Sequence, residues 1–385
     1  MKPRILLQDF RVLLPRYQRP QQEGFAWLGA AHARAEATAR GLSDAPQEWT
    51  ASMERLARRY GCSAEHIGRR RSELEDFMHV DWPRMRIFNL HQCAEGRSLG
   101  ARNQFFAETA NRAIEDLFAG DTDPPSDLVH VTCTGYTSPS AVQRLIELKK
   151  WNGHSRATQI YHMGCYAAVP ALRVAAGILQ TPQNGSPPRA EIVHTELCTL
   201  HFNPREHSPE QFVVQSLFAD GHVRYSIAQE GSATGRPVFE VLAVREESVP
   251  STLNDMTWAL SEFGFRMTLS SEVPSKVAAS LPGFLARLFA GTGESYEKAR
   301  ERAIFAVHPG GPKIIDSIQQ VLHLGEEQIQ ASRAVLFEHG NMSSATLPHI
   351  WAEVSGSGSV ESNTPVVSLA FGPGLTIAGT LFRKC

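Results

Sequence analysis

The sequence predicts an α/β protein in which helices cover both faces of a central sheet. Three observations support this fold class. Short apolar runs with strand character alternate with segments whose apolar residues recur at helical spacing, between residues 98 and 179 and again between 254 and 339. The most apolar run, Met163–Leu179, has the length of a buried helix. With 42% hydrophobic and 20% charged residues, a chain of 385 residues can bury a large core.

The first half opens with a short strand at Ile5–Leu7, followed by loosely specified helices up to residue 60. The elements expected after it are a helix over 98–118, a strand over 128–134, a helix over 140–150, a strand over 158–162 and the apolar helix after 163. Residues 190–200 and 211–228 are expected to form two strands joined by a polar loop.

The second half repeats this alternation. The helices expected here cover 254–265, 273–289, 312–324 and 326–338, and the strands cover 267–269, 303–308, 365–372 and 375–383. Two similar halves without detectable sequence repetition suggest an internally duplicated fold. We expect the first half to span residues 1–240 and the second 241–385.

Composition excludes several functional classes. A formal net charge of −2, with acidic and basic residues mixed along the chain, does not predict binding to nucleic acid or to an anionic membrane. The six cysteines lie far apart, so we expect free thiols in a reducing cytoplasm and no metal site. The apolar start is too short for a signal peptide, and Met163–Leu179 carries Arg173 in its middle, which argues against a membrane span.

Cys165 stands between a predicted strand and the apolar helix. There it would face the positive end of the helix macrodipole, which lowers a thiol pKa and favours a nucleophilic thiolate. The alternative is a small apolar side chain that fills a gap in the core, which is the commoner fate of a single cysteine.

Two polar residues of the second half have similar alternatives. His308 ends an apolar strand before the turn Pro309–Pro312, where it could face a ligand crevice or simply cap the strand. Asn341 follows Gly340 at the end of a helix, where local propensity favours a helix cap or a left-handed turn residue.

Taken together, four segments resemble, in order and spacing, the active-site motifs of type III polyketide synthases, the chalcone and stilbene synthase family. The segments are Met163-Gly-Cys-Tyr-Ala-Ala, Ala306-Val-His-Pro-Gly-Gly-Pro, Glu338-His-Gly-Asn-Met-Ser-Ser-Ala and Phe371-Gly-Pro-Gly-Leu-Thr. The resemblance runs from about residue 55 to the C-terminus. It implies a thiolase fold, which is a duplicated five-layered αβαβα arrangement, an acyltransferase and a homodimer.

The resemblance also implies roles for individual residues. Cys165 would accept the acyl chain, with His308 and Asn341 as its partners. A thiolate can accept and release an acyl group, while imidazole and carboxamide can donate hydrogen bonds to an enolate oxygen. No metal or other cofactor is required. Phe218 would gate the cavity, Met267 would line it, the loop Gly372-Pro373-Gly374 would close over the nucleophile, and Ser138 would lie in the loop that crosses the dimer in plant relatives.

The remaining positions bear on substrate and donor. Arg55, Arg58, Arg59 and Arg69 lie where the family binds the phosphates of coenzyme A, but they would equally suit an acidic acyl carrier protein or form an ordinary solvated helix face. His222 and Arg224 fall on a strand that is normally apolar, so we expect them to be paired or exposed, with a polar substrate cavity as the alternative.

Three functions remain open from the sequence. The first is a ketosynthase that makes a pyrone or resorcinol by Claisen condensation of acyl thioesters on coenzyme A or acyl carrier protein. The second follows divergent relatives, such as the ketosynthases of myxobacterial α-pyrone antibiotic pathways, and fuses two β-ketoacyl chains head to head without decarboxylation. The third is a non-catalytic thiolase-fold protein that binds acyl chains or a partner enzyme.

Overall fold

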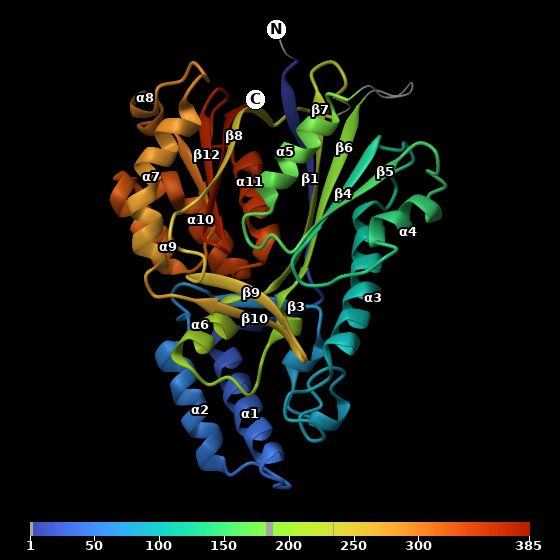
Figure 1. The fold of residues 1–385 in the computed structure, drawn as a ribbon, viewed down its shortest axis with the longest axis vertical. Coiled ribbons are helices and arrows are strands. Elements are labelled where there is room, and N and C mark those ends of the chain that lie inside the picture. The colour runs from blue at the N-terminus through green and yellow to red at the C-terminus, as the bar shows by residue number, and fades with distance from the viewer. Residues whose placement is uncertain (1–2, 182–187, 234) are drawn as a thin grey trace.

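One long sheet organises the protein. The structure is a computed structural model that describes residues 3–181, 188–233 and 235–385. Within these ranges nine strands follow the order β11-β12-β13-β8-β1-β7-β6-β4-β5 (Figure 1). These strands are β1 Ile5–Leu13, β4 Asp127–Thr132, β5 Arg156–Tyr161, β6 Arg189–Leu197, β7 Asp220–Gln229, β8 Phe239–Ser248, β11 Ile304–Val307, β12 Pro365–Gly372 and β13 Thr376–Lys384.

The sheet consists of two half-sheets with a short connection. Strands β1 and β8 pair only at Leu6 with Glu240 and at Leu7 with Phe239. By contrast, β1 pairs with β7 and β8 pairs with β13 along most of their lengths. The half-sheet β5-β4-β6-β7-β1 comes from the first part of the chain, and β8-β13-β12-β11 comes from the last part.

Helices form three further layers. Between the half-sheets lie α5 Ala168–Ile178, which packs on β4, β6, β7, β8 and β13, and α11 Thr346–Gly356, which packs on β1, β7 and β11 (Figure 1). Outside the first half-sheet lie α3 Leu99–Leu117 and α4 Ala141–Leu148. Outside the second lie α7 Val273–Phe289 and α10 Glu326–His339, with α9 Pro312–Leu322 packed on both. The expected five-layered αβαβα fold is therefore confirmed.

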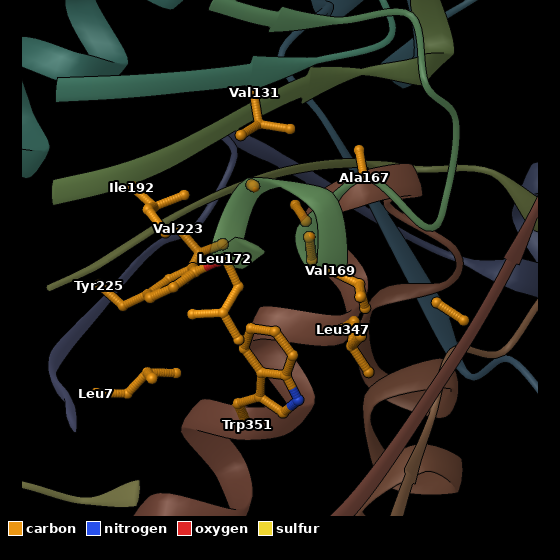
Figure 2. Close-up of a cluster of buried hydrophobic side chains, with 14 of the residues drawn as sticks. Leu7, Val131, Ala167, Val169, Leu172, Ile192, Val223, Tyr225, Leu347 and Trp351 are labelled. Atoms are coloured by element: carbon orange, nitrogen blue, oxygen red, sulfur yellow. The ribbon is translucent and has the colours of Figure 1, made fainter. Parts of the chain in front are cut away.

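The apolar run that begins at Met163 forms the centre of this arrangement. Figure 2 shows Val169 and Leu172 of α5 among side chains of β6, β7 and α11, including Ile192, Tyr225 and Trp351. Arg173 instead points outward, where its Nε lies 2.7 Å from Glu246 Oε1. The central charge therefore stays in contact with solvent while the rest of the helix is buried, as expected for a core helix.

A smaller group of elements lies at one end of the sheet, at the bottom of Figure 1. Helices α1 and α2 pack against each other, α2 packs on α6, and two short ribbons, β2–β3 and β9–β10, lie above them. The bounds are α1 Gln21–Ala39, α2 Gln47–Tyr60, α6 Pro209–Leu217, β2 Tyr17–Pro20, β3 Arg69–Ser72, β9 Met256–Ser261 and β10 Gly264–Leu269. The short helix α8, Tyr296–Arg300, follows α7.

Two sequence-based predictions of secondary structure were wrong. Residues 254–265, expected to be a helix, form β9 and the start of β10, because Trp258 and Phe265 pack in a hairpin that turns at Glu262 and Phe263. Residues 211–228, expected to be one strand, contain α6 and then β7. The Ser208 hydroxyl caps α6 by accepting the N–H of Gln211 at 3.2 Å, and Pro209 occupies the first helical position.

None of the helices in the described ranges is long and apolar enough to cross a membrane.

Candidate active site

Cys165 lies in the turn that connects β5 to α5, and its side chain is buried, with the residue only 7% exposed. The preceding Gly164 adopts φ of +82°, and a Cβ at this position would come within 2.4 Å of Pro373 Cδ. Gly164 donates its N–H to Cys133 Sγ at 3.0 Å and accepts the N–H of Ala167 at 3.1 Å. The turn therefore fixes the thiol immediately before the buried helix.

Residues of the second half of the chain lie next to this thiol. Ser343 Oγ is 3.9 Å from Cys165 Sγ. Asn341 Oδ1 accepts the N–H of Ser343 at 2.8 Å and the hydroxyl of Thr346 at 3.4 Å, so its amide nitrogen is the group that can donate to the Cys165 sulfur. The backbone of Asn341 pairs with Leu217 and Ala219 on either side of Phe218. The structure therefore brings Cys165 and Asn341 together from the two halves.

The environment of Cys165 keeps the thiol protonated. Burial raises its pKa to about 12, and the carboxyl of Glu196 acts in the same direction. Hydrogen bonds from Ser343 and Asn341 to the sulfur oppose this shift without cancelling it. The lowered pKa expected from the helix terminus is therefore wrong, because desolvation of the charged thiolate outweighs the favourable contacts.

His308 follows β11, and its N–H donates to the carbonyl of Leu369 at 2.8 Å. Its ring is buried, and neither ring nitrogen has a hydrogen-bond partner in the described part of the chain. Burial lowers its pKa to about 3, so the imidazole is neutral. His308 therefore lies at the end of the strand, as expected. It forms no hydrogen bond with Cys165, its expected partner.

An apolar cavity opens from Cys165. Of the residues expected to contact substrate, Phe218, Met267 and Pro373 line it. The other lining residues come mainly from the segment after β6 and from the β9–β10 hairpin, and include Cys133, Thr134, Cys198, Thr199, His201, Phe202, Gln211, Val214, Met256, Trp258, Phe265 and Ser343.

The loop at Pro373 has the close backbone approach expected of it. Gly372 ends β12, and a Cβ there would come within 2.2 Å of the Tyr166 ring, while Gly374 adopts φ of +69°. Neither position accepts a side chain without displacement of its neighbours or backbone strain. Ser138, in contrast, is exposed and does not line the cavity of its own chain.

Sequence reasoning missed most of the cavity wall on the β9–β10 side. Trp258 donates its indole N–H to the carbonyl of Cys133 at 2.8 Å, and the ring of His201 stacks on Phe265 with centroids 4.2 Å apart. The missed signal was the sequence Met256-Thr-Trp, whose aromatic and β-branched residues favour a strand.

The basic residues expected to bind a carrier lie outside this cavity. Arg55, Arg58 and Arg59 lie on the exposed side of α2, where Arg58 donates to Glu54 and stacks on Phe25. Arg69 lies on β3 and contacts Glu338 at 3.2 Å. Arg70, which follows Arg69 in the sequence, lines the cavity and donates to the carbonyl of Phe218 at 2.8 Å.

The two unusual polar residues of β7 are paired, as expected. His222 Nε2 lies 3.2 Å from Glu73 Oε1. Arg224 contacts Asp121, lies 3.7 Å from Glu191 and stacks over the ring of Phe118 at 4.0 Å. Both side chains are buried and neither lines the cavity beside Cys165, so the alternative of a polar substrate wall built from them is wrong.

All six cysteines are free thiols, and no cluster of His, Cys, Asp or Glu among the described residues could hold a metal ion.

Five layers, with a buried cysteine immediately before the central helix α5, define a thiolase-like protein. Models of the chalcone and stilbene synthases match most of the chain after residue 91, the N-terminal domain at residues 92–230 and the C-terminal domain at 240–385. The chain belongs to the chalcone and stilbene synthase family. Because the chain belongs to this family, the expected class of enzyme, a polyketide-forming acyltransferase, is confirmed.

Two curated relatives illustrate the range of the family. The chain is 31% identical over 276 residues to "Probable polyketide synthase 1" of Dictyostelium discoideum, an alignment that covers 71% of this chain but 8% of that protein. It is 28% identical over 277 residues to "Type III polyketide synthase C" of Arabidopsis thaliana, covering 71% of this chain and 69% of that protein. The chain therefore spans only a small part of the Dictyostelium relative.

Solved structures agree on the fold. The C-terminal type III polyketide synthase domain of Steely1, a type I/III hybrid from Dictyostelium, superimposes with a TM-score of 0.81 at 24% identity, covering 99% of each chain. The enzyme PKS-I of the brown alga Ectocarpus siliculosus gives a TM-score of 0.81 at 22% identity, covering 100% of this chain and 99% of that chain.

Proposed function

We propose that the chain is a type III polyketide synthase-like ketosynthase, in which Cys165 carries the growing acyl chain during Claisen condensation of acyl thioesters. The observation that carries this proposal is the placement of a buried thiol from one half of the fold against Asn341 of the other, at the end of an apolar cavity. An apolar cavity suits an acyl chain, and the thiol at its end is the one nucleophile that the family motifs require.

Loading begins with a neutral thiol and a neutral imidazole. As Cys165 attacks the thioester carbonyl, its proton passes to His308, whose ring nitrogens have no other partner in the described chain. The bond from carbonyl carbon to carrier sulfur breaks, and the carrier leaves as a thiol with that proton. Because the Cys165 thiol and the His308 imidazole are both neutral, we expect the thiol to remain unreactive until a substrate fills the cavity.

Condensation then uses the same polar groups as hydrogen-bond donors. A malonyl-type extender loses carbon dioxide, and the enolate that forms attacks the acyl-Cys165 carbonyl. The bond from that carbon to Cys165 Sγ then breaks, so the lengthened chain stays on the extender's thioester and Cys165 leaves as a thiolate. The amide nitrogen of Asn341 and the imidazole N–H of His308 would donate to the enolate oxygen, so no metal is needed to stabilise the charge. The product is a pyrone or a resorcinol, released by cyclisation.

A second candidate keeps this site and changes the reaction. Met256 and Met267 both line the cavity, and their flexible side chains would adapt to long aliphatic chains. Two β-ketoacyl chains could then be fused head to head into an α-pyrone without decarboxylation. A homodimer, donors on coenzyme A or acyl carrier protein, and a cytoplasmic location belong to the same proposal.

The test is to weigh the intact protein after incubation with a panel of acyl-coenzyme A and acyl carrier protein thioesters. A mass increase of one acyl group is expected in the wild type and in Cys198→Ala, which removes another thiol from the same cavity, and no increase is expected in Cys165→Ala. Acylation that persists in Cys165→Ala would overturn the assignment of the nucleophile. A folded protein that no donor acylates would favour the non-catalytic acyl-binding alternative.

Measuring the carbon dioxide released distinguishes the two reactions. Decarboxylative condensation with malonyl-coenzyme A yields carbon dioxide in proportion to the extender consumed. Turnover of two β-ketoacyl thioesters without carbon dioxide would instead support head-to-head fusion.

A further inference from the structure

A second cavity adjoins the cavity beside Cys165. Arg70, Phe77 and Thr199 line both cavities and therefore surround their junction. The rest of the second cavity is built from the β2–β3 ribbon, the start of α1 and the segment after β3, namely Tyr17, Arg19, Pro20, Gln21, Gly24, Trp27, Leu28, Arg71, Ser72 and Met78. We call it the arginine chamber.

Three arginines of the chamber are crowded together. In the β2–β3 ribbon, Arg19 lies directly opposite Arg70, and Arg71 follows on the same strand. Like charges at directly opposed positions of a ribbon destabilise it. Arg70 is held by Gln21 Oε1 at 2.8 Å and by the carbonyls of Gln215 and Phe218. These partners are neutral, and the carboxyl of Asp220 acts on the charge of Arg70 electrostatically but forms no ion pair with it.

Arg19 and Arg71 lack even such partners. Each has a buried Nε with no hydrogen-bond partner, and neither forms an ion pair, among the residues that the structure describes. Burial lowers the pKa of both guanidinium groups. The carboxyl groups of Glu23 and Glu338 act on them electrostatically, but Glu338 is bonded to Arg69. Half-buried, unpaired guanidinium groups are costly unless an anion neutralises them.

The start of α1 adds to the positive potential. Gln21 and Gly24, in the first turn of this long helix, line the chamber, and a helix N-terminus favours negative charge. A Cβ at Gly24 would lie 3.4 Å from Arg70 Nη2, so the missing side chain keeps the space beside that nitrogen open.

The chamber is distinct from the basic face of α2. Gln21, Gly24 and Leu28 line the chamber from one side of α1, whereas Gln22 and Phe25, on another side, contact Arg58 of α2. Helix α1 therefore lies between the chamber and the arginines that the sequence assigns to a carrier.

We propose that the reaction cavity continues into the arginine chamber, and that the chamber binds a carboxylate at the far end of the substrate chain. The favoured starter is then an acyl thioester whose chain ends in a carboxylate. The apolar cavity holds the methylene chain, Phe77 forms an apolar wall at the junction, and Arg19 and Arg71 bind the terminal group. This substrate class rests on the proposed function, because the other end of the chain is attached to Cys165.

The test compares starters that differ only at their far end. Octanoyl, dodecanoyl and hexadecanoyl thioesters and their ω-carboxylated counterparts are offered to the wild type, to Arg19→Gln and to Arg71→Gln, and the rate of acylation is followed by intact mass. Arg84→Gln is the control, since the Arg84 side chain is 72% exposed and lines neither cavity. At one chain length or more, we expect the wild type and the control to favour the carboxylated chain at least about tenfold, and each chamber variant to lose that preference.

Two results would overturn the proposal. One is equal acylation by both kinds of starter at every length. The other is a chamber variant that slows all coenzyme A thioesters alike but leaves N-acetylcysteamine thioesters, which lack phosphates, unaffected, because the arginines would then bind the carrier.

A binding experiment separates this proposal from the proposed function. Calorimetry on Cys165→Ala compares monomethyl dodecanedioate with methyl dodecanoate, which differ in one carboxylate. Tighter binding of the carboxylate, lost in Cys165→Ala/Arg71→Gln, would support the chamber even if no thioester acylates the wild type. Equal binding of the two esters would overturn it.

Discussion

The two half-sheets bury different kinds of side chain. In the first half, charged groups lie inside the fold, among them Glu191, Glu196, Asp220 and Arg224. Past residue 250, Lys384 is the one buried charged side chain among the described residues, histidines aside, and the core there consists mainly of Phe, Leu, Ile and Val. The half that carries Cys165 is thus held by paired polar groups, whereas the half that supplies His308 and Asn341 is held by apolar packing.

This difference has a physical consequence. Glu196 accepts the N–H of Cys133 at 3.0 Å and the hydroxyl of Thr134 at 2.9 Å, so a polar network lies directly behind the cavity wall. Such a network holds strands in one register but becomes costly when a partner is lost. Apolar packing loses stability in proportion to the volume removed. The predictions below test this contrast, from the largest expected effect to the smallest.

Removal of Arg224 should have the largest effect. Arg224→Met removes the buried cation that contacts Asp121 and leaves Glu191 with Arg189 at 3.5 Å, and we expect a loss of about 3–5 kcal/mol in the free energy of unfolding. The double variant Arg224→Met/Glu191→Gln should recover part of this loss, since it removes the buried carboxylate that has lost one of its two arginines. Urea denaturation measures both. A loss below about 1 kcal/mol for the single variant would contradict the contrast between the half-sheets.

Acid should destabilise the protein through its buried histidines, four of them in the first half and His308 and His349 in the second, although Asp220, whose pKa burial raises to about 7, acts in the opposite direction. Burial lowers the pKa of His130, His194 and His201 to about 3 and that of His32 to about 4. Below their unfolded pKa of about 6.5 the unfolded chain binds protons that the folded chain does not, so stability rises with pH over this range and falls on acidification. Each such histidine contributes up to about 1.4 kcal/mol per pH unit.

The measurement is the free energy of urea unfolding at pH 7.5 and 5.5. His130→Gln should shrink the difference between the two values, because one buried titrating group is removed. His154→Gln, at an exposed histidine, should leave that difference as it is. If both variants keep the full difference, the acid sensitivity has another source.

The sequence predicted the helices and strands of the layers better than the contacts between segments that are distant in sequence. Regular apolar spacing located α3, α7, α9 and α10, and four ordered motifs located Cys165, His308 and Asn341. The β9–β10 hairpin was missed because its pairing partners and the Cys133 carbonyl that binds Trp258 are distant in sequence. The raised pKa of Cys165 was also missed, since it depends on how completely the second half covers the thiol.

Contact between the halves should be sensitive to one methyl group. Gly164→Ala places a Cβ within 2.4 Å of Pro373 at a residue with φ of +82°, so the turn carrying Cys165 must move. We expect acylation to slow by roughly 10²-fold, with a loss of stability of about 1–3 kcal/mol. Gly177→Ala is the matched control near the end of α5, where nothing lies within 4 Å of an added Cβ. Equal rates for both variants would show that the turn tolerates displacement.

The smallest effect should come from the apolar half-sheet. Ile318 is fully buried on α9, and Ile318→Val removes one methylene, for which we expect a loss of about 0.5–1.5 kcal/mol. Because Ile318→Val exposes no charge, the loss should be the same at pH 7.5 and 5.5. The loss caused by Arg224→Met should differ between these pH values, because the carboxyl of Glu191 can then take up a proton. Val321→Ala, at a 38% exposed position of the same helix, should change the unfolding free energy less. An Ile318→Val loss that depends on pH would mean that packing in this half is coupled to the buried polar network of the other.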